Sequence, residues 1–313
     1  IIPCFCNAAE GEKDPRCLYL IMQTLSNYVY IYQEDIFVLS AGGDIGDIDG
    51  NATISVNSSV TTIRESQDGI DRFVERVYNL VACYFPITFV PPPDDPFKIS
   101  TQMLVDSLQS CLTSHAMLYK HTVPFLIDQI TESYANIDDT DAVSTISHAL
   151  NCVLEIFNRQ LTSNNPSLTP TATTTNAAQA QARTLLIEQL VIYQNPLKQL
   201  LFNVAMLMGQ APLVQQAIDC IAAVCRFIWA SGVEGCGSGG CNSNRDSCCK
   251  TATSKVSESE SQSEPTQLWT SITVWFITQL NTELGAEVGS VNAKASMNIV
   301  LGIIQSCHTP QPS

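Results

Sequence analysis

The stretch Glu10-Gly11-Glu12-Lys13-Asp14-Pro15-Arg16 leads the chain into its first clear helix. Asp is favoured just before a helix, and Pro is favoured at the first helical position, where its missing N–H has no partner to lose. Apolar residues then recur at helical spacing: Leu18, Ile21, Met22, Leu25, Val29 and Tyr32. We therefore expect Asp14 to cap a helix that begins at Pro15.

A second stretch also turns the chain: Cys83-Tyr84-Phe85-Pro86-Ile87-Thr88-Phe89-Val90-Pro91-Pro92-Pro93-Asp94-Asp95-Pro96. A helix is predicted over about residues 70 to 84, and Pro86 should end it. The three prolines at 91 to 93 should hold the following segment extended, because each fixes its own φ. Ser100 is placed to cap the next helix, whose predicted core residues are Leu104, Val105, Leu108, Cys111 and Leu112.

The rest of the chain is also predicted to be helical. The expected helices cover about residues 116–134, a segment from Asp141, and residues 180–208, 211–230, 267–284 and 287–307. Pro124 should kink or restart its helix near Thr122, and Pro196 should kink the helix that contains it. Gly/Asp/Ser/Thr-rich residues 41–68 are predicted to form a loop, Ser/Thr/Asn/Pro-rich residues 162–178 a flexible linker, and low-complexity residues 231–264 a disordered segment.

Successive helices that pair antiparallel predict an all-α, HEAT/armadillo-like helical-repeat solenoid with disordered insertions. Three segments are expected: HEAT-like repeats over residues 1–160, an insertion over 161–266 with helices at about 180–230, and a further helical pair over 267–308. The first and last segments would then belong to one array of repeats.

The composition narrows the classes of partner. The chain has 313 residues, of which 45% are hydrophobic, with 30 acidic and 15 basic side chains and a net charge of −15. This charge, with no Lys/Arg cluster, argues against direct nucleic-acid binding. No apolar run of about 18 residues is uninterrupted, so we expect no transmembrane helix and no membrane partner. The chain begins with Ile1 rather than Met and shows no signal-peptide pattern, so we expect a partial gene product.

Cysteine usage favours an intracellular, reducing location. The thirteen cysteines are an odd number, and several occupy apolar positions of predicted helices: Cys83, Cys111, Cys152, Cys220, Cys225 and Cys307. Two glycosylation acceptor triplets, at Asn51 and Asn57, support the alternative of a secreted protein, but both lie in one Ser/Thr-rich loop.

One cysteine group is a candidate metal site. Four thiols that can bind zinc or an iron–sulfur cluster lie close together: Cys236, Cys241, Cys248 and Cys249. The usual pair of cysteines two residues apart is missing, and the surrounding sequence is Gly/Ser-rich. We therefore favour an unstructured, thiol-bearing insertion and expect no resident metal or cofactor, with a metal-binding protein as the alternative.

No catalytic motif is present. The histidines His115, His121, His148 and His308 do not have metalloprotease spacing, and there is no phosphate-binding loop or nucleophile elbow. We expect His148 on the solvated side of its helix. The aromatic residues at helical positions should pack between helices: Tyr19, Tyr28, Trp229, Trp269 and Trp275. The sequence therefore predicts that the protein is not an enzyme.

The two quoted stretches, in this order, resemble the MMS-nineteen family. Residues 104–112 and 122–133 continue the resemblance, and Leu268-Trp269-Thr270-Ser271-Ile272 continues it more weakly. The resemblance implies a HEAT-repeat scaffold of late cytosolic iron–sulfur assembly, without catalytic residues. It also implies partners among the assembly factors and among apo iron–sulfur enzymes such as XPD-type DNA helicases and DNA polymerases. Roles in DNA repair and transcription, in cytoplasm and nucleus, would follow.

The resemblance covers only part of the family's N-terminal region, and docking to other assembly factors depends in the family on its C-terminal region. The alternatives are the metal-binding protein and an unrelated helical-repeat scaffold. The family-motif residues with a hypothetical partner-contact role are Gly11, Asp14, Pro15, Arg16, Phe89, Pro91, Pro92, Pro93, Asp94 and Asp95.

Overall fold

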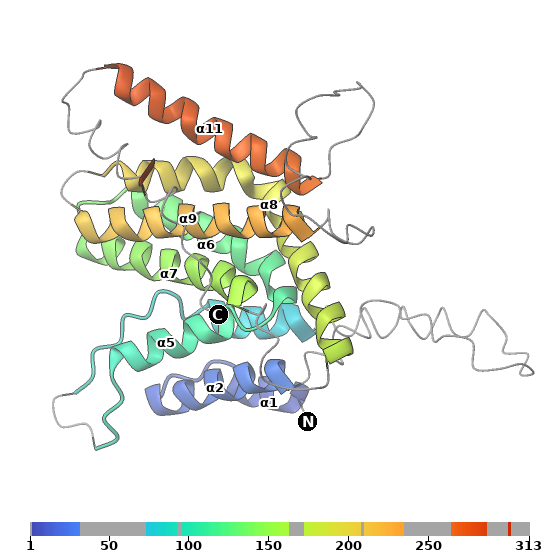
Figure 1. The fold of residues 1–313 in the computed structure, drawn as a ribbon. Helices are drawn as coiled ribbons and strands as arrows, with labels where there is room; N and C mark the ends of the chain where they lie inside the picture. The colour runs from blue at the N-terminus through green and yellow to red at the C-terminus, as the bar shows by residue number, and fades with distance from the viewer. Residues whose placement is uncertain are drawn as a thin grey trace, which may run out of the picture. The chain divides into compact units, whose positions relative to one another are not determined.

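The computed structural model describes residues 2–31, 73–92, 96–162, 172–207, 210–234, 264–286 and 300–301. Within these ranges every regular element is a helix and none is a strand, which confirms the all-α prediction (Figure 1). The chain divides into two compact units. Unit 1 comprises Ile1–Ile156 and Ser163–Gln189, and unit 2 comprises Phe157–Thr162 and Leu190–Ser313.

Unit 1 begins with α1 (Ile2–Ala9), which the sequence analysis missed, and α2 (Pro15–Ile31). The predicted cap of α2 is confirmed, because the backbone N–H of Arg16 donates to Asp14 Oδ1 at 2.9 Å. The residues of α2 that face the core recur at helical spacing: Leu18, Met22, Leu25 and Val29.

The next helix of unit 1 covers residues 73–82, so it ends four residues before Pro86 rather than at it. Its last turn closes with backbone hydrogen bonds from Tyr84 to Val81 and from Phe85 to Ala82, each 3.1 Å long. α5 (Thr101–Leu112) follows, and Ser100 caps it as predicted by accepting a hydrogen bond from Met103 N at 3.1 Å. All five predicted core residues of α5 are buried.

A short 3₁₀ turn, η1 (Ala116–Leu118), precedes α6 (Tyr119–Tyr134). The helix starts at Tyr119 rather than near Thr122, because η1 turns the chain first, and α6 continues through Pro124 in its second turn. α7 (Thr140–Thr162) is capped by Asp139, whose Oδ1 accepts from Asp141 N at 3.1 Å. Asp141, where the sequence predicts the start, is the second residue of the helix and lies in its first turn.

The core of unit 1 is continuous from α1 to η1. α2 and α5 lie side by side (Figure 1), and their buried residues join those of the 73–82 helix in one cluster. The most buried members are Met22, Leu25, Val77, Cys111 and Leu112, each with no exposed surface. Burial of such side chains contributes about 1.5–3 kcal/mol each, so this cluster provides much of the stability of the unit.

α8 (Ala172–Ala205) begins inside the predicted linker, so the linker prediction is wrong for residues 172–178. The Ala-rich sequence of that part favours helix more strongly than its Thr residues oppose it. Residues 163–171 lie outside the described part, and α8 continues through Pro196.

α9 (Ala211–Glu234) packs beside α11 (Glu264–Ala286) in unit 2 (Figure 1). The sequence placed disorder from residue 231, but residues 231–234 complete the last turn of α9. Aromatic contacts hold this unit: the ring centroids of Phe157 and Phe227 are 5.6 Å apart, and those of Phe202 and Trp275 are 5.7 Å apart. Of the last predicted helix, only residues 300–301 are described, and they are helical.

Within α9, Ala211–Ser231 is long and apolar enough to cross a membrane, with a mean hydropathy of 1.4. However, 61% of its most apolar window is buried inside the protein, as in a core helix. Polar residues interrupt this segment in the sequence. Its mean hydropathy nevertheless reaches the level of a membrane-spanning helix.

Two predictions of a buried side chain fail in the described residues. Cys83 is exposed because it lies just after the end of its helix, whereas the predicted burial is confirmed for Cys111, Cys152, Cys220 and Cys225. Trp229 is 57% exposed on α9 rather than packed between helices. The thiol of Cys307 and the side chain of Trp269 lie outside the described residues.

Candidate protein-interaction surface

The two stretches that the sequence singles out pack against each other in unit 1. Tyr84 Oη, in the second stretch, donates a hydrogen bond of 2.8 Å to the carbonyl oxygen of Glu12 in the first. The guanidinium of Arg16 lies over the ring of Phe97, 4.5 Å from its centroid. We call the group formed by Glu12, Asp14, Arg16, Tyr84 and Phe97 the motif junction.

The turn before α2 positions the residues that the first stretch contributes to the motif junction. Gly11 has φ of +75°, a left-handed conformation that glycine adopts without a steric penalty. The carboxylate of Glu12 then accepts backbone hydrogen bonds from Lys13 at 2.8 Å and Asp14 at 2.9 Å. The hydrogen bond from Asp14, followed by that from Lys13, lowers the pKa of Glu12 below its ordinary value.

Asp14 and Arg16 form an ion pair at the start of α2. Asp14 Oδ1 accepts from Nε of Arg16 at 2.8 Å as well as from its backbone N–H. Hydrogen bonds from Arg16 hold the pKa of Asp14 well below its usual range. Those from the Arg16 side chain have the largest effect, and that from its backbone N–H comes next. With Pro15 as the first helical residue, the turn therefore fixes the guanidinium where it meets Phe97.

The second stretch is anchored in the core at its beginning. Phe85 packs edge-on against Phe125 at 5.5 Å between ring centroids, and the Phe85–Pro86 peptide is cis. Further along, the carbonyl oxygen of Phe89 accepts from Thr101 Oγ1 at 2.7 Å, and the Phe89 ring packs against the core.

The predicted contact residues of this loop thus differ in placement. Phe89 and Pro91 are half-buried and Pro92 is exposed, whereas Pro93, Asp94 and Asp95 lie outside the described residues. Of the predicted partner-contact residues, Gly11, Asp14, Pro15 and Arg16 lie together in the turn before α2 and its first residues. The partner-contact role of the loop stays a prediction.

Two exposed apolar side chains, one in the motif junction and one next to it, were missed by the sequence analysis. Phe97 is 58% exposed, and Leu20, one helical turn after Arg16 on α2, is 60% exposed. Leu20 lies outside the helically spaced positions of α2 that face the core. Helical periodicity could therefore have identified it as an exposed apolar residue. Contiguous apolar patches with a polar rim mark protein interaction sites, and these two side chains with the Arg16 ion pair are the candidate for one here.

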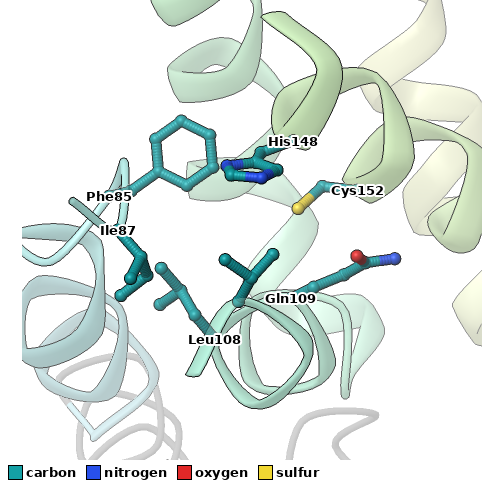
Figure 2. Close-up of a pocket in the computed structure, with 7 residues that line it drawn as sticks. Phe85, Ile87, Leu108, Gln109, His148 and Cys152 are labelled. Carbon is teal, nitrogen blue, oxygen red and sulfur yellow. The ribbon is translucent and has the colours of Figure 1, made fainter. Parts of the chain in front are cut away.

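A small pocket in unit 1 has the ring of His148 and the thiol of Cys152 in its lining (Figure 2). Figure 2 shows the His148 ring beside Phe85 and the Cys152 sulfur directed into the cavity, whereas Gln109 points away. His148 is half-buried, so its predicted solvated position is wrong. Burial lowers the pKa of His148, partly offset by the charge of Asp106.

This pocket does not have the properties of a catalytic site. Burial raises the pKa of the Cys152 thiol to about 12, so the thiol is protonated and a weak nucleophile. The cavity has a volume of about 10 Å³, room for a single water molecule. The pocket is therefore a packing defect between α5, α7 and the second stretch.

The described residues contain no group of three or more His, Cys, Asp or Glu side chains placed to hold a metal ion. The candidate thiols Cys236, Cys241, Cys248 and Cys249 lie outside those residues. Their metal-binding role is untested.

Comparison with known proteins identifies relatives of the N-terminal part. The chain is 30% identical over 132 residues to the MMS19 DNA repair/transcription protein of Saccharomyces cerevisiae, a match that covers 42% of this chain and 9% of that protein. It is 27% identical over 143 residues to the MMS19 nucleotide excision repair protein homolog of Danio rerio, covering 46% of this chain and 10% of the relative.

The chain thus spans about a tenth of the length of these relatives. No solved structure matches it. The family model described as "Dos2-interacting transcription regulator of RNA-Pol-II" matches residues 1–163 of the 313, a range that contains the whole motif junction. The match extends over more than half of the chain, and the chain therefore belongs to this MMS19 family.

Proposed function

We propose that the chain is part of a non-catalytic scaffold that serves DNA repair and transcription. In finer detail, we propose that it holds apo iron–sulfur enzymes, such as XPD-type helicases and DNA polymerases, while cytosolic assembly factors deliver their clusters. Its helices would continue as a HEAT-like solenoid, and it would act in both cytoplasm and nucleus.

The observation that carries this proposal is the family match over residues 1–163, which includes both halves of the motif junction. The names of the relatives support the repair and transcription role. The family model's description names a protein interaction, which supports a role through protein partners.

The chemistry of unit 1 supports binding rather than catalysis. The buried thiols Cys111 and Cys152 each have a pKa raised to about 12 by burial, so neither is a ready nucleophile or metal ligand at neutral pH. The exposed Phe97 and Leu20 beside the Arg16 ion pair instead supply apolar contact with a charged border. A scaffold of this kind raises the local concentration of a target near its delivery partner.

The test is affinity purification of the tagged protein from its own cells, followed by mass spectrometry. We expect cytosolic iron–sulfur assembly factors and apo iron–sulfur enzymes to co-purify. Recovery of neither class, from a tagged protein that still supports DNA repair, would contradict the cluster-assembly role and leave the repair role standing.

A further inference from the structure

A groove of about 420 Å³ runs between α2 and α5 of unit 1. Four residues at helical spacing on α2 form one wall: Tyr19, Gln23, Ser26 and Asn27. This volume lies within the range of about 300–1,000 Å³ that ligand sites occupy. The groove is separate from the motif junction, whose residues do not line it.

The facing wall comes from α5, again at helical spacing: Met103, Asp106, Ser107 and Ser110. The α2 wall extends from residue 19 to residue 27, which is about 12 Å at the helical rise of 1.5 Å per residue. An extended peptide rises about 3.3 Å per residue. The groove therefore has the length of about four residues of extended chain.

The groove presents polar groups with unused hydrogen-bonding capacity. Ser107 lines the groove, and its hydroxyl makes no hydrogen bond within the described residues. The amide of Asn27 makes none there either, and Ser26 and Ser110 are joined only by a long contact of 3.4 Å between their hydroxyl oxygens. A ligand that supplies hydrogen-bond partners to these groups gains affinity.

The chemistry of these groups selects the ligand. Amide and hydroxyl side chains both donate and accept, which matches the alternating N–H and C=O groups of an extended backbone. Met103 and Tyr19, both half-buried, offer an apolar surface for a side chain of that peptide. These features favour a peptide over a phosphate-bearing ligand, because none of the described residues that line the groove is Lys or Arg.

The negative charge of the groove indicates that the ligand should carry a basic residue. Among the described residues, Asp106 is the one carboxylate in the lining, and it is exposed. Its Oδ1 accepts from Gln102 Nε2 at 2.8 Å, which leaves Oδ2 without a hydrogen bond in the described part of the chain. The net charge of −15 also attracts a basic segment.

We propose that this groove binds an extended segment of a partner protein, with a Lys or Arg of that segment paired to Asp106. The inference goes beyond the proposed function and stands whether or not the partner is an iron–sulfur enzyme. The chain's own residues 32–72 are a less suitable occupant, because their acidic residues outnumber their basic ones by eight to two and Asp106 would repel them.

The test is selection of 12-residue peptides, from a random display library, on the purified full chain. The variants are Asp106→Asn and Asn27→Ala. The matched control is Asp219→Asn on α9, because Asp219 Oδ1 accepts from Gln215 Nε2 at 2.9 Å just as Asp106 accepts from Gln102. We expect enriched peptides to contain Lys or Arg and to bind Asp106→Asn about tenfold or more weakly, with no change in Asp219→Asn.

Three outcomes would overturn the proposal. The first is failure to enrich any peptide over bare support. The second is enrichment of peptides that bind Asp106→Asn and Asn27→Ala as tightly as the natural chain. The third is a cross-link, from a photoreactive group at position 23, to the chain's own residues 32–72. Circular dichroism of each variant verifies that it folds like the natural chain.

Discussion

The hydroxyl of Tyr84 donates a hydrogen bond of 2.8 Å to the carbonyl oxygen of Glu12, 72 residues earlier in the chain. This contact ties the loop before α5 to the turn before α2. It places Phe97 and Arg16 on one surface, where the guanidinium lies over the ring. The geometry of the motif junction thus depends on a tertiary contact as well as on local turn chemistry.

Replacing Tyr84 by Phe should lower the free energy of unfolding by about 1 kcal/mol, because the Glu12 carbonyl loses its partner while the ring remains. The urea unfolding transition measures this change. Tyr19→Phe is the matched control, since the hydrogen bond that Tyr19 Oη makes within the described residues comes from the exposed Gln23 side chain four residues away, at 2.6 Å. Equal effects in the two variants would show that the Tyr84 contact contributes nothing specific.

Replacing Gly11 by Ala should destabilise unit 1 by about 1 kcal/mol, because an L-residue at φ of +75° is strained. No atom lies within 4 Å of the added Cβ, so the cost comes from the backbone alone. Gly11→Asn should cost less, since Asn tolerates this conformation. Urea denaturation of the three proteins tests this order, and an Ala variant as stable as the natural chain would contradict it.

The stability of unit 1 should decrease in acid partly through Asp14. Its pKa is lower in the folded than in the unfolded chain, so its contribution is present above the unfolded pKa, about 4, and is lost as the pH falls through the folded value. Asp14→Asn keeps a capping side chain but cannot titrate. Between pH 5 and pH 2, the urea midpoint should fall less in Asp14→Asn than in the natural chain. Parallel curves would contradict the assignment.

Replacing Leu112 by Ala should cost about 3 kcal/mol, because Leu112 has no exposed surface and its loss leaves a cavity in the core of unit 1. Leu20→Ala removes the same atoms from an exposed position on α2 and should change stability by less than about 0.5 kcal/mol. Thermal unfolding of both variants checks the pair. Similar losses would mean that Leu20 is covered in solution.

Local signals explain what the sequence predicts well. The caps at Asp14 and Ser100 are correct because each depends on a side chain and a backbone N–H only two or three residues away. The start of α8 is misplaced because a composition rich in Thr and Asn is typical of linkers, although the Ala residues among them favour helix. Capping positions are therefore more predictable than a helix start without a cap.

The candidate sites depend on contacts that no local pattern encodes. The Tyr84–Glu12 and Arg16–Phe97 contacts join residues that are distant in sequence. The sequence identifies these residues, but it does not show that they come into contact. The same holds for the groove, because helical periodicity places Ser107 on a buried face of α5 without showing that it lines a groove beside α2. Tertiary packing alone decides these features.

The most direct test of the scaffold proposal is the iron content of an XPD-type helicase purified from cells that produce this protein in altered form. Leu20→Ser with Phe97→Ser alters the exposed apolar side chain of the motif junction and the one next to it. Val274→Ser with Ile277→Ser alters two comparably exposed residues on α11 as the control. We predict a severalfold loss of helicase iron in the first variant, at unchanged protein level, and none in the second. Full iron content in both variants would contradict the account.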